Sequence, residues 1–197
     1  MFFEKIPVFR SHLFMKYLIA SDIHGSAAWC KKVLTIAKNE NVDKLLLVGD
    51  LLYHGPRNPF PEQYDTKAVY EMLNDHKDLL LCVRGNCDSE VDQMVCDFPM
   101  MDDYKVLPLG DRTLYLTHGH LHEAEKALVP LVAGDLQVNG HFHVPTFKRL
   151  DNGTLYANCG SAGLPKDGSP HSCMLVTEEE LCWIDLSSGN VFHKQRL

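Results

Sequence analysis

The sequence has no apolar run long enough for a membrane-spanning helix, which needs roughly 20 consecutive apolar residues. It also has no run of Lys and Arg, and its formal net charge is −7. A surface with this charge repels the phosphates of a long DNA or RNA duplex, so a nucleic-acid binder is not expected. Hydrophobic residues make up 45% of the 197 residues, which is enough for a globular core.

None of the seven cysteines forms a CxxC pair, and this bears on the compartment. They stand at positions 30, 82, 87, 96, 159, 173 and 182. An odd and scattered set favours a reducing compartment over a disulfide framework. Residues 1–14 lack the continuous apolar core of a signal peptide, because charged residues such as Lys5 and Arg10 interrupt it. We predict a cytoplasmic protein with an N-terminal extension over residues 1–14 and a single domain over residues 15–197.

Short apolar runs alternate with helical patterns in the first half of the chain. The expected order is strand 16–21, helix 26–39, strand 44–48, helix 66–76 and strand 79–83. In the first of these helices, apolar residues from Ala27 to Ala37 share one face. Uninterrupted apolar strands that alternate with helices predict a parallel sheet covered by helices.

The second half of the chain has a different pattern, with short strands joined by turns that contain glycine. Strands are expected over residues 112–117, 146–150, 154–157, 173–177 and 181–186, and a short helix over residues 89–94. Turns such as Asp151-Asn152-Gly153 are typical of connections between antiparallel strands. This half therefore predicts a second, mostly antiparallel sheet that packs on the first. The fold class is α/β, with two sheets flanked by helices.

Five polar motifs are each expected to follow directly after a strand, although no range is predicted for the strand before the last of them. They are DIHG (22–25), GD (49–50), GN (85–86), THGH (117–120) and GHFH (140–143). Each motif alone is common in turns. In an open α/β sheet, however, ligands bind beyond the carboxyl ends of the strands, so the five loops can meet at one edge. The combination therefore indicates one shared site.

The residue types in these motifs suit two divalent first-row metal ions, since carboxylate, imidazole and amide groups form a mixed nitrogen and oxygen set. Asp50 is the natural bridge, because two cations can share one carboxylate. Two ions about 3.5–4 Å apart can lower the pKa of a bound water to about 7 and neutralise a phosphoryl group. The candidate metal ligands are Asp22, His24, Asp50, Asn86, His118, His141 and His143.

In order and spacing, these motifs resemble the pattern of the calcineurin-like metallophosphoesterase superfamily, D-x-H, G-D, G-N-H-[DE], H and G-H-x-H. The resemblance covers about residues 15–161 and points within the superfamily to the small bacterial and archaeal YfcE-type phosphodiesterases. It rests further on the segments 54–64 (HGPRNPFPEQY), 84–94 (RGNCDSEVDQM), 117–121 (THGHL) and 158–166 (NCGSAGLPK). The implied fold is a four-layer α/β-β/α sandwich of two mixed sheets flanked by helices, with the C-terminal strands in the second sheet.

The resemblance also implies how the ligands are divided between the ions. Asp22, His24, Asp50 and His143 would hold one metal ion, and Asp50, Asn86, His118 and His141 would hold the other. The expected cofactors are two divalent metal ions, Mn²⁺ first, with Zn²⁺, Fe²⁺ or Ni²⁺ as alternatives.

One departure from the family pattern concerns the general acid. Many relatives have a histidine directly after Gly-Asn, whereas this chain has Cys87. A thiol is a weak proton donor with an ordinary pKa of about 8.5, so we expect a strong preference for good leaving groups such as nitrophenolate. We interpret Cys87 as a small group beside the substrate rather than as a nucleophile. His54 and His120 are the candidates for the missing acid; a solvated loop is the alternative for His120.

Three polar residues near the motifs have two interpretations each. Arg57 can clamp a phosphate oxygen or form a surface ion pair. Asn58 can bind substrate or form a turn. Asp88 would orient the histidine of the family pattern, or it can cap the helix over residues 89–94.

The sequence predicts a binuclear metal-dependent phosphodiesterase that hydrolyses small phosphodiesters. A phosphomonoesterase with the same metal site and a non-catalytic scaffold of the same fold are the alternatives, since fold alone does not decide activity. The complete ligand set favours an enzyme, because a scaffold does not need these histidines. A small phosphoester is the expected partner, and the family resemblance adds a homo-oligomer as an expectation.

Overall fold

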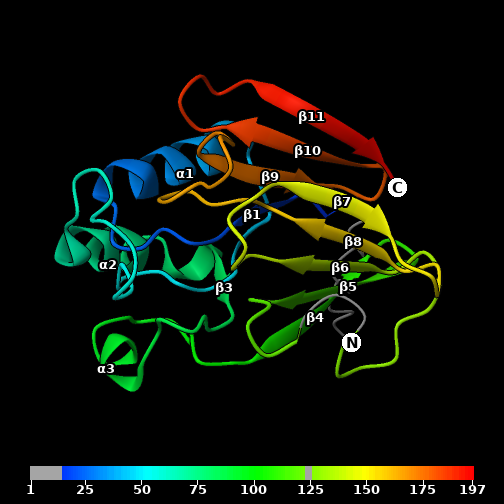
Figure 1. The fold of residues 1–197 in the computed structure, drawn as a ribbon, viewed down its shortest axis with the longest axis horizontal. Helices are drawn as coiled ribbons and strands as arrows, with labels where there is room; N and C mark the ends of the chain where they lie inside the picture. Colours follow the sequence, from blue (N-terminus) through cyan, green and yellow to red (C-terminus); the bar gives the residue numbers. More distant parts are fainter. Residues whose placement is uncertain (1–14, 123–125) are drawn as a thin grey trace, which may run out of the picture.

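The structure is a computed structural model that describes residues 15–122 and 126–197 (Figure 1). Residues 1–14, the predicted N-terminal extension, lie outside the described residues. The first half contains β1 (Tyr17–Ala20), α1 (Ala27–Asn39), β2 (Lys44–Leu47), α2 (Thr66–Asn74), the 3-10 helix η1 (Lys77–Leu79), β3 (Leu80–Cys82) and α3 (Glu90–Gln93). The second half contains β4 (Tyr104–Leu109), β5 (Arg112–Thr117), β6 (Leu136–Asn139), β7 (Thr146–Arg149), β8 (Leu155–Asn158), β9 (Ser172–Val176), β10 (Glu180–Asp185) and β11 (Val191–Arg196).

Two mixed sheets flanked by helices form the molecule, which confirms the predicted fold class. The first sheet has the strand order β11-β10-β9-β1-β2-β3. Its strands β1, β2 and β3 are parallel, and β9, β10 and β11 pair antiparallel. The second sheet has the order β4-β5-β6-β8-β7, with parallel pairs at its centre and an antiparallel strand at each edge.

The C-terminal strands correct two predictions. They belong to the first sheet, because β9 pairs with β1, and the second sheet is therefore mixed rather than mostly antiparallel. The physical reason lies in β9, which is apolar on both faces. Cys173 packs in the core beneath the helices, whereas Met174 and Val176 pack in the core between the two sheets. Within residues 15–122 and 126–197, only the first sheet has a core cluster on each of its faces.

Alternate side chains of β1 point into the two different cores, which lie on opposite faces of the first sheet. Leu18 and Ala20 face the core shared with α1 and α2, and Tyr17 and Ile19 face the core between the sheets. Helix α1 begins after Ser26, whose hydroxyl accepts a hydrogen bond from the Trp29 backbone N–H. Its buried face consists of Cys30, Val33, Leu34 and Ala37, in agreement with the predicted pattern.

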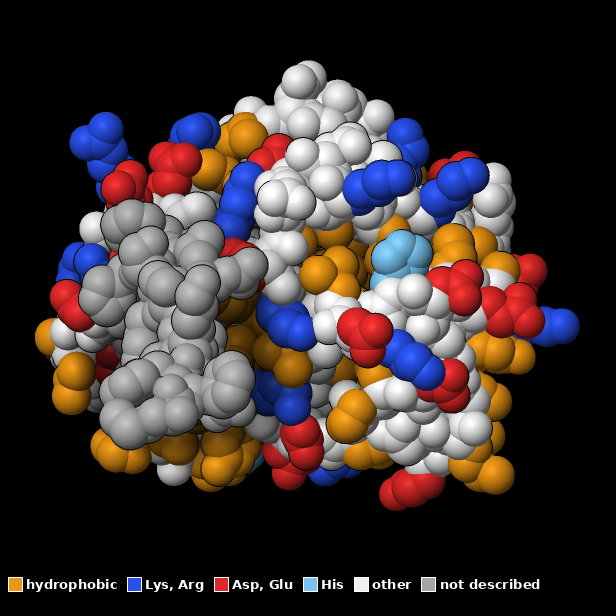
Figure 2. All heavy atoms as spheres, turned by 180° about the vertical axis from the view of Figure 1, so that it is seen from behind, with side chains coloured by type: hydrophobic (Ala, Val, Ile, Leu, Met, Phe, Trp, Pro, Cys, Tyr) orange, Lys and Arg blue, Asp and Glu red, His pale blue; other side chains and the backbone are white. Residues whose placement is uncertain are grey.

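Among the described residues, a loop over residues 126–134 lies against the outer face of the second sheet, where the predicted four-layer arrangement has a helix. The backbone N–H of Leu128 in this loop donates to the Tyr115 hydroxyl at 3.4 Å. None of the described helices is long and apolar enough to cross a membrane. Charged side chains of both signs are interspersed on the face shown in Figure 2, without a continuous basic stripe.

Candidate metal centre

The seven candidate ligands all lie in loops directly after strands, and these loops meet at one end of the two sheets. Asp22 and His24 follow β1, Asp50 follows β2, Asn86 follows β3, His118 follows β5, and His141 and His143 follow β6. The loops approach closely because two of them contain glycine at points of contact. A Cβ at Gly85 would clash with the Asp50 carboxylate, and a Cβ at Gly140 would clash with the Ser21 hydroxyl.

Two carboxylates and three imidazoles form the centre of the cluster. His24 Nε2 lies 3.7 Å from Asp22 Oδ1 and 3.6 Å from Asp50 Oδ2. His118 Nε2 lies 3.5 Å from Asp50 Oδ2 and 4.0 Å from Asp22 Oδ1. His143 Nε2 lies 3.2 Å from Asp22 Oδ1. Each imidazole therefore faces at least one carboxylate oxygen through its Nε2 atom.

The same three imidazoles are held by the backbone through their other nitrogen. Because a carbonyl oxygen only accepts, each Nδ1 must carry the proton and donate. The acceptors are the carbonyl oxygens of Tyr53 for His24 (2.8 Å), of Val48 for His118 (2.6 Å) and of Leu164 for His143. In the neutral ring this leaves the lone pair on Nε2, directed at the carboxylates.

The cluster fits a metal pair because it places acceptors against acceptors. Asp22 Oδ1 and His24 Nε2 are buried atoms with no hydrogen-bond partner among the residues that the structure describes. Buried polar atoms without a partner are costly, and two facing acceptors repel each other unless a cation or proton lies between them. Asp22, Asp50 and His118 also offer ligand atoms within 4.8 Å of one another, as do Asp22, His24 and His143. Divalent ions would satisfy all these atoms.

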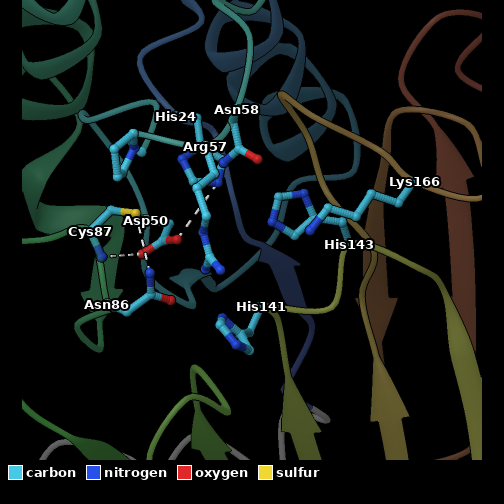
Figure 3. Close-up of a pocket in the computed structure, with 11 residues that line it drawn as sticks. His24, Asp50, Arg57, Asn58, Asn86, Cys87, His141, His143 and Lys166 are labelled. Atoms are coloured by element: carbon cyan, nitrogen blue, oxygen red, sulfur yellow. Dashed lines mark hydrogen bonds and ion pairs between the residues drawn. The ribbon is translucent and has the colours of Figure 1, made fainter.

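Asn86 and His141 complete the set at its edge. Asn86 Oδ1 lies 3.2 Å from His118 Nε2. The backbone N–H of His141 donates to Asp22 Oδ2 at 3.0 Å, and its ring centroid lies 5.1 Å from that of His118. Both side chains line the cavity above the carboxylates (Figure 3).

The pKa shifts reflect this charge arrangement. Burial favours a neutral His118, but its contact with Asp50 and the charges of Asp22 and Asp50 outweigh burial and raise the pKa of His118 to about 9. Burial lowers the pKa values of His24 and His141. Burial alone would raise the carboxylate pKa values, yet the facing imidazoles hold the pKa values of Asp22 and Asp50 below their ordinary range. The two carboxylates therefore favour a positive charge at the centre of the cluster, either on a protonated His118 or on a metal ion.

Backbone strain is concentrated at the same residues. Five candidate ligands have φ in the left-handed region: Asp22 (55°), His24 (51°), Asp50 (55°), His141 (66°) and His143 (63°). This conformation costs a non-glycine residue about 1–2 kcal/mol. Such strain persists where the surrounding structure fixes it, and it marks this edge of the sheets as a functional site rather than a set of ordinary turns.

Asp88 has neither of the roles expected for it. Ser89 caps α3, in a reciprocal capping box with Asp92. The buried Asp88 carboxylate instead accepts hydrogen bonds from the backbone N–H groups of Asp50 (2.7 Å), Leu51 (2.9 Å) and Gly85 (2.7 Å). Burial and the charge of Asp50 raise the pKa of Asp88 to about 6, so the carboxylate is ionised at neutral pH. Asp88 joins the loop of the expected bridging ligand to the loop of Asn86.

A cavity of about 370 Å³ opens over the cluster, and the expected substrate residues Arg57, Asn58 and Cys87 line it. Asn58 also forms the turn that was its alternative, since its side chain donates to the His54 carbonyl at 2.9 Å. Burial and Asp50 raise the pKa of Cys87 to about 12. Its sulfur lies within 4.8 Å of candidate ligand atoms of His24 and Asp50.

The two candidates for the general acid lie in different surroundings. The ring of His54 packs against Phe60 (centroids 4.5 Å apart) and Tyr64 (5.3 Å), and His54 is not among the described residues that line the cavity. The ring of His120 lies 5.4 Å from that of His118 and 6.3 Å from that of His141. Burial and these two imidazoles lower the pKa of His120 to about 4. His120 therefore lies beside the ligands, and it is neutral at pH 7.

Lys166 lines the cavity as well, and the sequence did not single it out. It stands two residues after Leu164, whose carbonyl accepts a hydrogen bond from His143 Nδ1. The segment 158–166 contributed to the family resemblance, but a lysine after a proline in a loop carries no pattern that indicates a site.

The fold and the cluster together define a metal-dependent hydrolase with its site at the carboxyl ends of the strands of two mixed sheets. The chain belongs to the calcineurin-like phosphoesterase superfamily, whose domain model matches residues 15–181. This membership makes it an enzyme of phosphoester hydrolysis that uses divalent metal ions, as the sequence predicted.

The relatives agree with this family. The phosphodiesterase YfcE of Escherichia coli K12 is 39% identical over 177 residues, which cover 90% of this chain and 95% of the relative. The probable metallophosphoesterase YsnB of Bacillus subtilis is 30% identical, with 84% and 85% covered. The solved structure of YfcE from E. coli has a TM-score of 0.87 at 38% identity and covers 92% and 98% of the two chains. Vps29 of Entamoeba histolytica in complex with zinc, at 22% identity and a TM-score of 0.58, covers 93% and 98% and is similar in fold alone.

Proposed function

We propose that the chain is a binuclear metal-dependent phosphodiesterase that hydrolyses small phosphodiesters. The observation that carries the proposal is the cluster of two buried carboxylates faced by three imidazoles with their Nε2 lone pairs directed inward. The relative with 39% identity is named a phosphodiesterase, which supports the diester as the substrate. The physiological setting that we propose is the cytoplasm, and the seven free cysteines suit its reducing conditions.

The proposed division of ligands follows the family pattern. One ion is assigned to Asp22, His24, Asp50 and His143, and the other to Asp50, Asn86, His118 and His141. When bound, the pair supplies a hydroxide at neutral pH and positive charge for the phosphoryl oxygens. Mn²⁺ is the proposed native metal, with Zn²⁺, Fe²⁺ and Ni²⁺ as alternatives, because the nitrogen and oxygen donor set accepts each of them.

The residues of the cavity bind and orient the ester. Arg57 extends toward the metal cluster and is suited to hold two phosphate oxygens at once (Figure 3). Asn58 and Cys87 shape the wall beside it. The Cys87 thiol, with a pKa of about 12, is a poor acid, and His120, with a pKa of about 4, is neutral at pH 7 and lacks the readily donated proton of an imidazolium. His54 and His120 stay the proposed candidates for the general acid, and a weak acid at this site favours activated esters.

The proposal is tested with purified protein, bis-nitrophenyl phosphate and nitrophenyl phosphate, in Mn²⁺, Zn²⁺, Mg²⁺ or chelator. We expect metal-dependent release of nitrophenolate, with the diester preferred. Asp50→Asn should lower kcat by about 10²-fold or more, because the shared carboxylate charge is lost. Asp111→Asn, at an exposed position in the turn between β4 and β5, is the matched control. Absence of metal-dependent turnover of both esters would contradict the proposal.

The remaining expectations concern partners. A small phosphoester is the proposed partner, without a long nucleic acid or a membrane. A homo-oligomer stays a prediction, and sedimentation of the purified protein tests it.

A further inference from the structure

Two cations line the cavity without an acidic partner. Neither Arg57 nor Lys166 has a carboxylate within ion-pair distance in the part of the chain that the structure describes. On the face shown in Figure 2, charged side chains of both signs are interspersed. Unpaired cations aimed at a shared cavity are typical of a site for an anion.

The two cations come from different walls of the cavity. Arg57 belongs to the loop between β2 and α2, on the side of Asp50 and Cys87, whereas Lys166 reaches in from the loop between β8 and β9, on the side of His143 (Figure 3). They are therefore placed for two different groups of one ligand. If a phosphoryl group binds at the candidate metal ligands, Arg57 would reach it from the wall of Asp50 and Cys87, and Lys166 would stand on the wall of His143.

The backbone of the Lys166 loop is fixed against the metal ligands. The Ser161 hydroxyl and the Gly163 N–H both donate to the Asp22 carbonyl at 2.9 Å. The Lys166 N–H donates to the His143 carbonyl at 3.3 Å, and the Ser169 N–H closes the following turn on the Lys166 carbonyl at 2.9 Å. These contacts fix the backbone of Lys166 beside His143, and from there its exposed side chain reaches the cavity.

Charge balance identifies what Lys166 can bind. If the proposed function holds, two divalent ions are balanced in full by Asp22, Asp50, one hydroxide and one singly charged diester. The positive charge of Arg57 would stabilise the negative charge that develops on the phosphoryl oxygens during attack. The charge of Lys166 then has no counterpart on a simple diester. A substrate with a second anionic group supplies that counterpart.

We propose that Lys166 forms a subsite for a second anionic group, and that the substrates are phosphodiesters with a further phosphate or carboxylate near the scissile phosphorus. This inference rests on the proposed function. Lys166 acts in binding and specificity, through KM, and takes no part in bond cleavage.

The kinetic test compares two activated esters in the Mn²⁺-loaded protein: thymidine 5′-(nitrophenyl phosphate) and the same ester with an added 3′-phosphate. In the unmodified chain, kcat/KM should be about tenfold higher for the 3′-phosphorylated ester, the range of one charge-assisted contact. Lys166→Gln should remove the preference by raising KM, with kcat unchanged, and Lys166→Arg should retain it. Lys32→Gln, which removes an exposed charge on α1, is the matched control.

A binding test separates this subsite from the catalytic proposal. Calorimetry of the Mn²⁺-loaded protein should show thymidine 3′,5′-bisphosphate binding about tenfold more tightly than thymidine 5′-phosphate, with the difference lost in Lys166→Gln. Equal affinities in the unmodified chain would overturn the subsite, even if both esters are hydrolysed. A Lys166-dependent preference for the bisphosphate without turnover of either ester would support the subsite and contradict the proposed function. If Lys166→Gln weakens both nucleotides equally, Lys166 contacts the scissile phosphoryl group and the proposal is wrong.

Discussion

The Nδ1 hydrogen bonds decide which way the candidate ligand imidazoles face. Each ring donates to a backbone carbonyl distant in sequence, 29 residues away for His24, 70 for His118 and 21 for His143. The backbone therefore selects the tautomer and points Nε2 at the carboxylates before a metal ion is present. The motifs predicted the ligand types, because the residues themselves carry the chemistry. The motifs did not reveal which backbone carbonyls orient the imidazole rings.

The proton on His118 gives a prediction about pH. A pKa raised to about 9 lies above the ordinary value of about 6.5, so the His118–Asp50 pair stabilises the metal-free fold fully below pH 6.5. That stabilisation is lost as the pH rises toward 9. Metal binding must displace this proton, so its apparent affinity should rise by up to about tenfold per pH unit over the same interval.

Nuclear magnetic resonance of the ring nitrogens in the metal-free protein checks this prediction. His118 should titrate near pH 9, while His24 and His141 should be neutral at pH 7. Thermal unfolding of the metal-free protein should shift to lower temperature between pH 6.5 and 9. Titration of His118 near its ordinary value would show that the two carboxylates do not act on it as described.

Cys87 gives a second prediction at the scale of one side chain. Its backbone N–H donates to Asp50 Oδ1 at 2.8 Å, a contact that does not need the thiol. With a pKa of about 12, the sulfur is protonated at neutral pH and is not a nucleophile. Cys87→Ala should therefore keep kcat on bis-nitrophenyl phosphate within about fivefold. Cys182→Ala, remote from the cavity lining, serves as control, and a loss of about a hundredfold or more only at Cys87 would give the thiol a chemical role.

At the scale of elements, the sequence predicted the strongly patterned β2 and α1 and also the exposed edge strand β7, whereas β4, β6 and β11 received no predicted range. The buried strand β2 and the amphipathic helix α1 lie where the sequence places them. β4 was missed because it is an edge strand that is mostly exposed and contains Pro108. The buried strand β6 was missed because it has only four residues, in which Gln137 and Asn139 alternate with the apolar positions. β11 was missed because its side chains are nearly all exposed, so they follow no apolar period. Which sheet β9–β11 join depends on burial of both faces, which a single strand pattern does not reveal.

The link between the loops after β2 and β3 depends on Asp88. Asp88→Asn keeps one oxygen and turns an N–H group toward backbone donors, so buried N–H groups of these loops lose their partner. We expect the free energy of unfolding to fall by about 2–3 kcal/mol and Mn²⁺ affinity to fall with it, because Asp50 and Asn86 are no longer held together. Denaturant unfolding and metal titration measure the two effects.

The control for Asp88→Asn is Asp97→Asn. Asp97 pairs with Lys77 across 3.5 Å at the surface, where an ion pair contributes less than about 1 kcal/mol. Wild-type stability together with wild-type metal affinity in Asp88→Asn would mean that the loops keep their geometry without this carboxylate.

In the whole molecule, the apolar cores and the metal centre are separate contributions. The two core clusters lie beneath the helices and between the sheets, and they consist of apolar side chains with no candidate metal ligand among them. At one end of the sheets, the candidate ligands instead have left-handed backbone conformations and hydrogen-bond acceptors that face each other, and both lower the stability of the fold. The apolar cores therefore provide the free energy that stabilises the fold. The candidate metal ligands lower the stability locally, and a bound metal pair would reverse this loss. This division explains why the fold class and the ligands were both predictable from the sequence, through different signals.

Removal of metal should accordingly leave the chain folded but less stable. In chelator, thermal unfolding followed by circular dichroism should still show one cooperative transition. Mn²⁺ at a hundredfold excess over its Kd should add about 2.7 kcal/mol, and thus raise the Tm by about 5–10 °C. Asp50→Asn should lose most of this rise, because a ligand expected to serve both ions is impaired. A chelated chain without a cooperative transition would show that the cores are insufficient, and an equal Tm rise in Asp50→Asn would show that the metal binds elsewhere.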